Sequence, residues 1–243
     1  MRASGILLHI TSLPSPYGVG TMGKEAYKFV DFLKKSGQSY WQGLPVLTTG
    51  YGDSPYQSFS TFAGNPYLID LDMLCGDGLL KEEEYRDVDF GDDPEKVDYG
   101  KLFRTRSPLL RKAYKRGIAR DSAAFADFCA KHTYWLEDYG MYMALKEHFS
   151  QKSYHEWPID IRSREASALE TYRKLLDEDV RFYQYVQFLF FGQWMKLKEY
   201  ANTNGVRVIG DIPIYVADDS ADTCQASGAC SRGSGGWPYS RTG

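Results

Sequence analysis

The sequence predicts an α/β fold built on parallel strands. Two short apolar runs, residues 5–10 and 40–44, lie on either side of an amphipathic helical pattern at residues 24–36. A third apolar run, residues 206–209, follows a long stretch of helical character. A strand, a helix and a second strand in close succession form a βαβ unit, which requires parallel strands and a right-handed crossover.

Each element of the first βαβ unit has its own sequence signal. Residues 5–10 predict a buried strand, because they are apolar and a loop rich in Pro and Gly follows them. The helix expected over residues 24–36 ends at Gly37. Its apolar residues at i, i+3, i+4 and i+7 are Ala26, Phe29, Val30 and Leu33. Residues 40–44 form the second expected strand, which Pro45 ends.

The rest of the chain divides into a loop, a helical stretch and a last strand. Residues 48–66 are dense in Gly, Ser, Pro and Tyr, and a long loop with large side chains is typical of a functional segment. Residues 81–204 are mainly helical in pattern, and the clearest helix covers residues 179–203 with one apolar face. Gly205 closes that helix, and residues 206–209 predict a third buried strand.

Composition excludes several classes of protein. The 243 residues carry a net charge of −3, so there is no basic field to bind nucleic acid or an anionic membrane. The apolar runs are too short for a signal peptide or a membrane span. The four cysteines form no C-x-x-C pair, and the acidic run Glu82–Glu84 has the pattern of a solvated helix face, so we expect no metal and no cofactor. These features favour a reduced, cytoplasmic protein.

The aromatic content has two interpretations. Aromatic residues make up 15% of the chain, with 19 Tyr and 5 Trp. They indicate either a core rich in rings or a sugar-binding surface, because a ring covers the C–H face of a sugar while a phenol or indole meets a hydroxyl. Composition by itself favours the core.

Three stretches resemble the N-terminal motifs of one enzyme family. They are GILLH, TSLPS and YGVG within residues 5–20; YWQ, LP, TGYGDSPYQS and AGNPY within residues 40–67; and GDIPIYV and DSAD within residues 210–222. This ordered set is similar to the amylomaltases, the 4-α-glucanotransferase family, over residues 1–223.

The resemblance implies a (β/α)8 barrel of which this chain holds about the first three strands. A large helical insertion is expected between strands 2 and 3. A barrel needs eight strand–helix units, so these strands cannot close one. The implied parts are residues 1–80 with the first strands and a substrate loop, residues 81–178 as the helical insertion, residues 179–223 with a helix and the third strand, and residues 224–243 without structure.

The resemblance also implies an activity. The family transfers a segment of an α-1,4-glucan to the 4-OH of glucose or of another glucan, with retained configuration. Retention requires a carboxylate nucleophile and a carboxylic acid/base about 5 Å apart. In the family these residues lie on later barrel strands, so we expect no catalytic residue here and little activity of the chain alone. The expected partners are maltooligosaccharides or an α-1,4-glucan, and a C-terminal half of the enzyme.

Four substrate-binding residues are implied in the same way. Ser54 and Tyr56 are similar to first-subsite residues, where a ring stacks under the sugar and a hydroxyl bonds to it. Asp211 follows a strand at the end where barrel active sites lie, and is expected to contact substrate near the scissile bond. Tyr99 is similar to a tyrosine at a second glucan contact. The alternative for each residue is a turn or a packed side chain.

Other interpretations of the chain remain open. His9 and Trp41 are expected to belong to the core rather than to a site. The main alternative to an enzyme is a non-catalytic glucan-binding or interaction module. A small hydrolase that uses Asp53 and Asp211 is disfavoured, because loop acids are not held at a fixed separation.

Three features depart from the family pattern. Gly43 stands where the family has a branched apolar residue and is expected to leave a gap, and Thr48 stands where it usually has Pro. From Cys224 onward the sequence has no Leu, Ile, Val, Met or Phe, and the resemblance ends after Thr223. We expect this tail to be unstructured, because it cannot bury enough apolar surface, and to be translated out of frame.

Overall fold

Three parallel strands form the sheet of the computed structural model. The residues it describes are 2–50, 52–91, 93, 95–215 and 217–230. The strands are β1 (Gly5–Leu7), β2 (Tyr40–Gln42) and β3 (Arg207–Ile209), in the spatial order β1-β2-β3. Both strand pairs are parallel, which confirms the expected α/β class.

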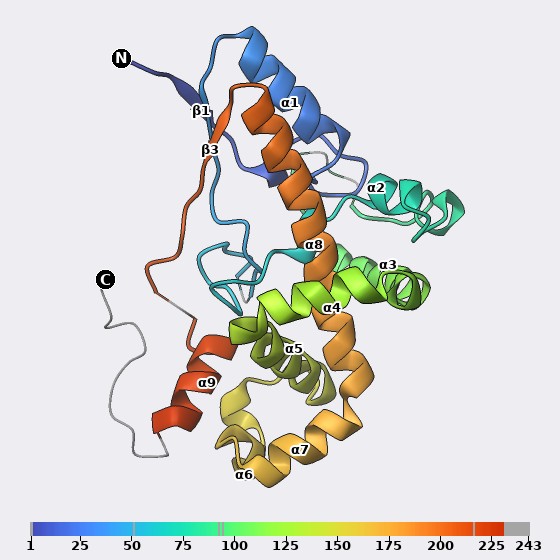
Figure 1. Cartoon of the computed structure of the whole chain (residues 1–243), viewed down its shortest axis with the longest axis vertical. Coiled ribbons are helices and arrows are strands. Elements are labelled where there is room, and N and C mark those ends of the chain that lie inside the picture. The colour runs from blue at the N-terminus through green and yellow to red at the C-terminus, as the bar shows by residue number, and fades with distance from the viewer. Residues whose placement is uncertain (1, 51, 92, 94, 216, 231–243) are drawn as a thin grey trace.

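Helices form most of the chain between β2 and β3 (Figure 1). The α-helices are α1 (Lys24–Lys35), α2 (Leu71–Gly76), α3 (Tyr99–Arg120), α4 (Ser122–Lys131), α5 (Thr133–His148), α6 (Ile159–Arg162), α7 (Ala166–Leu175), α8 (Asp177–Thr203) and α9 (Ala221–Cys230). Short 3-10 turns cover Ile10–Ser12, Pro66–Leu68, Glu82–Glu84 and Tyr154–Glu156. The expected helical segment between the second and third strands is therefore confirmed.

Helices cover one face of the sheet. The register places Ile6, Trp41 and Val208 side by side, and all three belong to or pack against the main core. Helix α1 contacts β2, and helix α8 contacts β3. Trp41 also meets Phe29 of α1 edge to face, with the ring centroids 5.0 Å apart, and so lies in the core as expected.

The opposite face of the sheet is open. There the register aligns Leu7 with Gln42 and Gln42 with Ile209, and Leu7 and Ile209 are 58% and 41% exposed. The prediction that the first and third strands are buried is therefore wrong for the side chains on this face. Both faces of a parallel sheet are normally covered, and the described residues place helices on only one of them.

Helix α8 joins the sheet to the helical part of the chain (Figure 1). Near its end it packs beside α1, where Tyr200 donates a hydrogen bond to Asp31 at 2.7 Å. Nearer its start it packs against α3 and α5. There Arg111 of α3 bridges Glu147 of α5 and Asp179 of α8, at 2.6 and 2.8 Å. One long helix thus takes part in both hydrophobic clusters that the described residues form.

Helix α9 extends past the expected end of regular structure. It runs from Ala221 to Cys230, whereas the sequence predicts no structure from Cys224 onward. Cys224 itself is buried against the second hydrophobic cluster, so its contacts are tertiary ones that composition does not reveal. Residues 231–243 lie outside the described residues.

Candidate functional site

The loop that carries the predicted sugar contacts is closed at its base by backbone hydrogen bonds. Thr48 N donates to Ala63 O at 3.2 Å, and Asn65 N donates to Val46 O at 2.9 Å. These two bonds form an antiparallel bridge between Leu47 and Gly64. The intervening residues therefore project as one closed loop, the shape that suits a binding segment on a rigid base.

The tip of this loop folds back on itself. Gly50 N donates to Gln57 O at 3.0 Å, and Asp53 N donates to Gly50 O at 3.2 Å. Gly52 and Asp53 both adopt positive φ, 82° and 55°. Glycine tolerates that region and Asp is among the few other residues found there, so this sequence suits the tight turn. The half-buried Ser54 follows the turn directly.

Two of the predicted contacts are joined across the site. The phenol of Tyr56 donates a hydrogen bond to a carboxylate oxygen of Asp211 at 2.6 Å. Ser54 Oγ accepts from the backbone N–H of Tyr56 at 3.3 Å and so supports the same turn. The hydrogen bond to Asp211 is the main cause that raises the pKa of Tyr56, followed by burial and the charge of Asp211. The phenol therefore stays protonated as a donor, and Tyr56 as a whole remains 42% exposed.

Asp211 lies at the carboxyl end of β3, beside a small apolar cavity. The residues lining this cavity are His9, Ile10, Trp41, Gly43, Leu44, Val46, Trp194, Val208, Ile209, Gly210 and Asp211. A Cβ atom added to Gly43 would meet nothing within 4 Å, which agrees with the gap predicted there. In a parallel α/β sheet this end of the strands is where ligands bind.

His9 is a satisfied core histidine, as predicted. Its Nδ1 lies 2.7 Å from the hydroxyl of Thr11, and its Nε2 lies 3.2 Å from the carbonyl oxygen of Pro45. Burial lowers the pKa of His9 and outweighs the opposing hydrogen bond with Pro45, so the ring is neutral at physiological pH. Both ring nitrogens are engaged with protein atoms.

Tyr99 lies in a different hollow from the Tyr56–Asp211 pair. It begins α3, and its ring lies 6.2 Å from that of Tyr67. An open concavity is lined by Asp53, Gly91, Asp93, Lys96, Val97, Asp98, Tyr99, Gly100 and Lys101. Burial raises the pKa of Tyr99, and the charge of Asp53 adds to the effect. Because Asp53 lines it, the loop that carries Ser54 and Tyr56 borders this second hollow as well.

The described residues offer no metal-ligand cluster and no helix able to cross a membrane. No group of three or more His, Cys, Asp or Glu side chains is arranged around one point among them. No helix among them is long and apolar enough to span a bilayer. The acidic run Glu82–Glu84 was predicted to be a solvated helix face. Within it, Glu84 forms an ion pair with Arg116 at 2.5 Å, and the hydrogen bond from Arg116 is the main cause that lowers the pKa of Glu84 to about 2.

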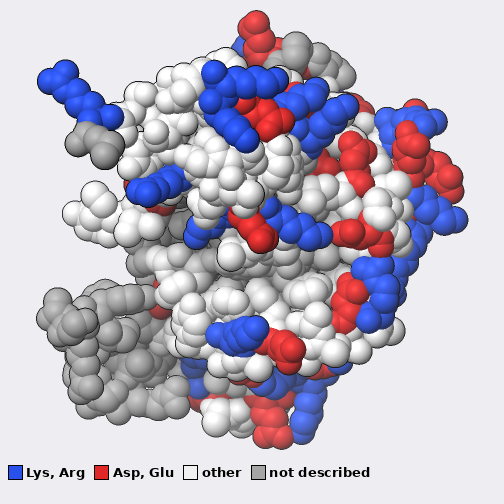
Figure 2. Space-filling model, turned by 45° about the horizontal axis from the view of Figure 1, so that its top comes forward, with Lys and Arg blue, Asp and Glu red and all other residues white. Residues whose placement is uncertain are grey.

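Charge is mixed on the surface. Lys and Arg alternate with Asp and Glu across the face seen in Figure 2, and no patch of a single sign dominates it. This distribution agrees with the net charge of −3 and offers no electrostatic footprint for nucleic acid on that face.

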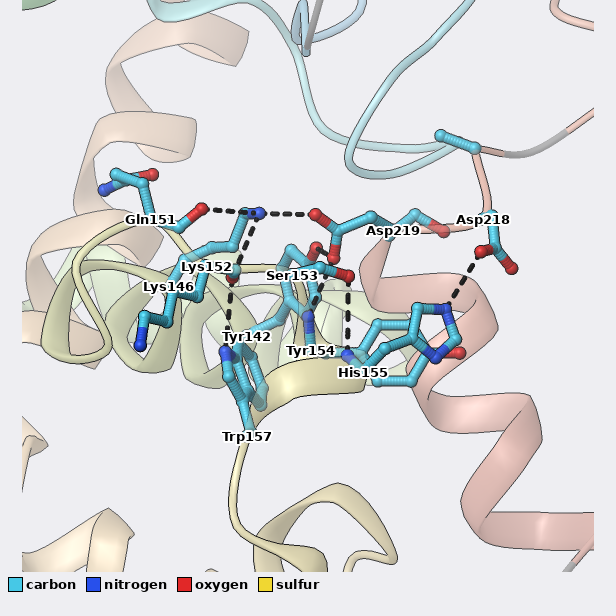
Figure 3. Close-up of polar contacts among 12 residues, drawn as sticks. Tyr142, Lys146, Gln151, Lys152, Ser153, Tyr154, His155, Trp157, Asp218 and Asp219 are labelled. Atoms are coloured by element: carbon cyan, nitrogen blue, oxygen red, sulfur yellow. Dashed lines mark hydrogen bonds and ion pairs between the residues drawn. The ribbon is translucent and has the colours of Figure 1, made fainter.

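Lys146 and Asp219, for which sequence reasoning predicted no role, form an ion pair in which the lysine is buried (Figure 3). The sequence does contain a signal for the buried lysine. Tyr139, Tyr142 and Lys146 follow one another at +3 and +4, so the lysine lies on the buried face of α5. A lysine on such a face requires an acidic partner, although the pattern does not say which one.

Comparison with known proteins agrees with this geometry. A family model described as 4-alpha-glucanotransferase matches residues 8–238, past Thr223 where the resemblance was expected to end. The chain is 51% identical over 223 residues to the 4-alpha-glucanotransferase of Streptococcus pneumoniae, covering 91% of this chain and 44% of the relative. It is 49% identical over 215 residues to that of Clostridium butyricum, covering 88% of this chain and 44% of the relative.

Solved structures are similar as well. An amylomaltase from Streptococcus agalactiae in complex with acarbose superposes with a TM-score of 0.89 at 48% identity, covering 91% of this chain and 45% of that one. An amylomaltase from Corynebacterium glutamicum, at 19% identity and a TM-score of 0.71, has the same fold over 93% of this chain. The chain spans less than half the length of these relatives. On the family match and these identities, the chain belongs to the 4-alpha-glucanotransferase family.

Proposed function

We propose that this chain supplies the glucan-binding wall of a 4-α-glucanotransferase. The enzyme transfers a segment of an α-1,4-glucan to the 4-OH of glucose or of another glucan, with retained configuration. The observation that carries the proposal is the Tyr56–Asp211 hydrogen bond of 2.6 Å, at the carboxyl end of β3. Its support comes from family membership and from the acarbose complex of the Streptococcus agalactiae relative.

Each side chain has a role that suits a sugar. The exposed ring of Tyr56 offers a flat apolar surface for the C–H face of a glucose unit. The carboxylate of Asp211 accepts hydrogen bonds from sugar hydroxyls, and charge-assisted bonds of this kind are stronger than neutral ones. Ser54 supports the turn and adds a hydroxyl. Tyr99, in its separate hollow, is proposed as a second glucan contact.

The chemistry of transfer is proposed to need carboxylates from outside this chain. A retaining mechanism requires two carboxyl groups about 5 Å apart on a rigid frame. Asp53 lies on a loop tip and lines a hollow other than the one beside Asp211. We therefore propose that the nucleophile and the acid/base belong to the remaining part of the enzyme. The described thiols Cys75, Cys129 and Cys224 are free, which fits a cytoplasmic location.

An activity assay tests the catalytic half of the proposal. The 243-residue chain, purified free of host enzyme, is expected to form no glucose or longer oligosaccharides from maltotriose. Covalent catalysis without its nucleophile loses most of its rate enhancement. Glucose release above a no-protein control would show that the chain holds its own catalytic carboxylates.

A binding titration tests the site itself. Maltoheptaose is expected to bind more weakly than micromolar, because one wall of a groove buries little of a ligand. Tyr56→Ala should abolish the binding, and Tyr56→Phe should weaken it less because the ring remains. Tyr134→Phe, at a tyrosine that is 64% exposed on α5, is the matched control.

The second candidate is a non-catalytic glucan-binding module. The observation that favours it is that Tyr56 and Asp211 already meet within this chain alone. The titration distinguishes the two functions. Micromolar affinity for maltoheptaose together with no transfer would favour the module.

A further inference from the structure

The segment that follows β3 is exposed in its middle and firmly held at its end. Ile212, Ile214 and Tyr215 are 77%, 89% and 84% exposed. The chain returns to packed structure around Asp219, whose carboxylate points into the helical part of the protein (Figure 3). Asp211 therefore lies between two held points of the chain, β3 before it and Asp219 after it.

Asp219 is the anionic partner of a buried lysine. Lys146 of α5 is only 4% exposed, and its Nζ lies 2.5 Å from Asp219 Oδ2. The same Nζ donates to the carbonyl oxygens of Gln151 and Lys152 at 3.3 Å. A buried ammonium group with all three donors engaged requires this carboxylate, because an unpaired charge in the interior is strongly unfavourable.

Two further donors hold the carboxylate in place. Tyr142 donates to Asp219 Oδ1 at 2.7 Å, and the backbone N–H of Tyr154 donates to the same oxygen at 3.1 Å. Burial raises the pKa of Asp219, but the hydrogen bonds from Lys146, Tyr142 and Tyr154 outweigh it and leave the pKa below its ordinary value. Asp219 is therefore an ionised carboxylate with a fixed orientation.

The residues after Asp219 also hold the loop that carries Tyr56. Ala221 N donates to Phe59 O at 2.8 Å, and Asp222 Oδ2 accepts from Thr61 N at 2.8 Å. Lys146 Nζ lies 5.3 Å from the centroid of the Phe59 ring. The ion pair is thus in contact with both segments that lead to the candidate site.

We propose that Asp219, paired with Lys146, is a positioning residue for the Tyr56–Asp211 pair. Phe59 follows Tyr56 closely in the sequence, and Asp219 follows Asp211 closely, so both ends of that hydrogen bond lead to the same fixed point. The inference rests on the proposed function only where it takes this pair as a glucan contact. The positioning itself is a property of the free protein.

Hydrogen–deuterium exchange of the full chain tests the positioning without a ligand. In Asp219→Asn, amides of residues 52–59 and 211–215 are expected to exchange about tenfold faster or more, while those of α1 and α3 stay unchanged. Glu84→Gln is the matched control, since Glu84 also forms ion pairs, with Arg116 and Lys112, and accepts one backbone N–H, from Lys81. That control should leave both site segments unchanged.

Two outcomes overturn the proposal. One is faster exchange throughout the chain in Asp219→Asn, which would mean that the ion pair only stabilises the fold. The other is unchanged exchange at residues 52–59 and 211–215. Asp219→Glu is expected to restore much of the protection, because its carboxylate still reaches Lys146. If Asp219→Asn fails to fold, slower exchange in Asp219→Glu than in Asp219→Ala supports the proposal, and equal exchange in those two variants overturns it.

Maltoheptaose then separates positioning from function. If the wild type binds, Asp219→Asn should weaken the affinity about tenfold, and should weaken it much less in a Tyr56→Phe background, because coupled residues are non-additive. Additive effects would contradict a role through Tyr56. If the wild type does not bind, the proposed glucan site fails, and the exchange data still decide whether Asp219 positions the two segments.

Discussion

Replacement of Gln187 by leucine should remove a large part of the stability of this protein. Gln187 lies on α8 and is fully buried. Its Oε1 accepts from Gly64 N at 2.8 Å, and its Nε2 donates to Gly64 O at 3.0 Å. Gly64 lies at the base of the loop that carries Tyr56, and its neighbours Ala63 and Asn65 form backbone hydrogen bonds with Thr48 and Val46.

The magnitude follows from the two backbone groups left without partners. A buried donor or acceptor that loses its partner costs about 1–3 kcal/mol. Gln187→Leu strands both groups of Gly64 while it keeps the side-chain volume, so the expected loss is about 4 kcal/mol. Native domains have a free energy of unfolding of about 5–15 kcal/mol, so the loss is a large share of the total.

Urea unfolding followed by circular dichroism measures this loss. Gln193→Leu should behave alike, because Gln193 makes the same pair of bonds with the backbone of Asp70, at 2.7 and 3.1 Å. Gln38→Leu is the control, since the side chain of Gln38 makes one weak hydrogen bond, of 3.4 Å to Ser36 O. A loss of less than about 1 kcal/mol for Gln187→Leu, relative to that control, would refute the reasoning, because a typical single hydrogen bond contributes that much.

Three further predictions follow from other contacts. Gly64→Ala should destabilise the chain by about 1–3 kcal/mol or more through overpacking, because a Cβ there would lie 2.1 Å from the Phe190 ring. The control is Gly76→Ala, whose Cβ would meet nothing within 4 Å and which should change the unfolding free energy little in the same urea titration. The pKa of Asp219 is lower in the folded state, so the stability that its ionised form contributes is present above the unfolded-state pKa of about 3.9 and is lost as pH falls through the folded-state pKa. The difference in unfolding free energy between wild type and Asp219→Asn should therefore shrink from pH 7 toward pH 3. A constant difference would argue against the ion pair. The open sheet face should cause self-association, and the double variant Leu7→Lys, Ile209→Lys should raise the monomer fraction in light scattering, whereas a monomeric wild type with a cooperative thermal transition would contradict this expectation.

Much of the fold could be predicted because it is recorded locally. The apolar spacing in residues 24–36 and 179–203 gave helices that the structure places at Lys24–Lys35 and Asp177–Thr203. The prediction failed for the burial of β1 and β3. An apolar run shows that a strand can be buried, but it does not show whether other parts of the chain cover both faces of that strand. The prediction also failed for the start of the tail because α9 continues to Cys230, and the burial of Cys224 in the second hydrophobic cluster is a tertiary contact that composition does not record.

The candidate site also has parts that the sequence predicts and parts that it does not. Residues 48–66 could be recognised as a functional loop from their composition, and Asp211 from its place after an apolar strand. Their meeting could not be derived from spacing, because Tyr56 and Asp211 are 155 positions apart and the loop tip that carries Tyr56 has no periodicity. The buried lysine of α5 was detectable as a conflict between charge and helical face, but its partner was not.

The sequence by itself determined the α/β class, the order of the elements, the faces of the long helices and the family. Those properties depend on periodicity, turn residues and motifs, which are local. Tertiary structure alone decided that Gln187 holds Gly64, that Asp219 neutralises Lys146, and that Tyr56 donates to Asp211. Each of these contacts joins residues that are far apart in the chain, and a polar group buried by folding takes its partner from whichever segment the packing brings within hydrogen-bond distance.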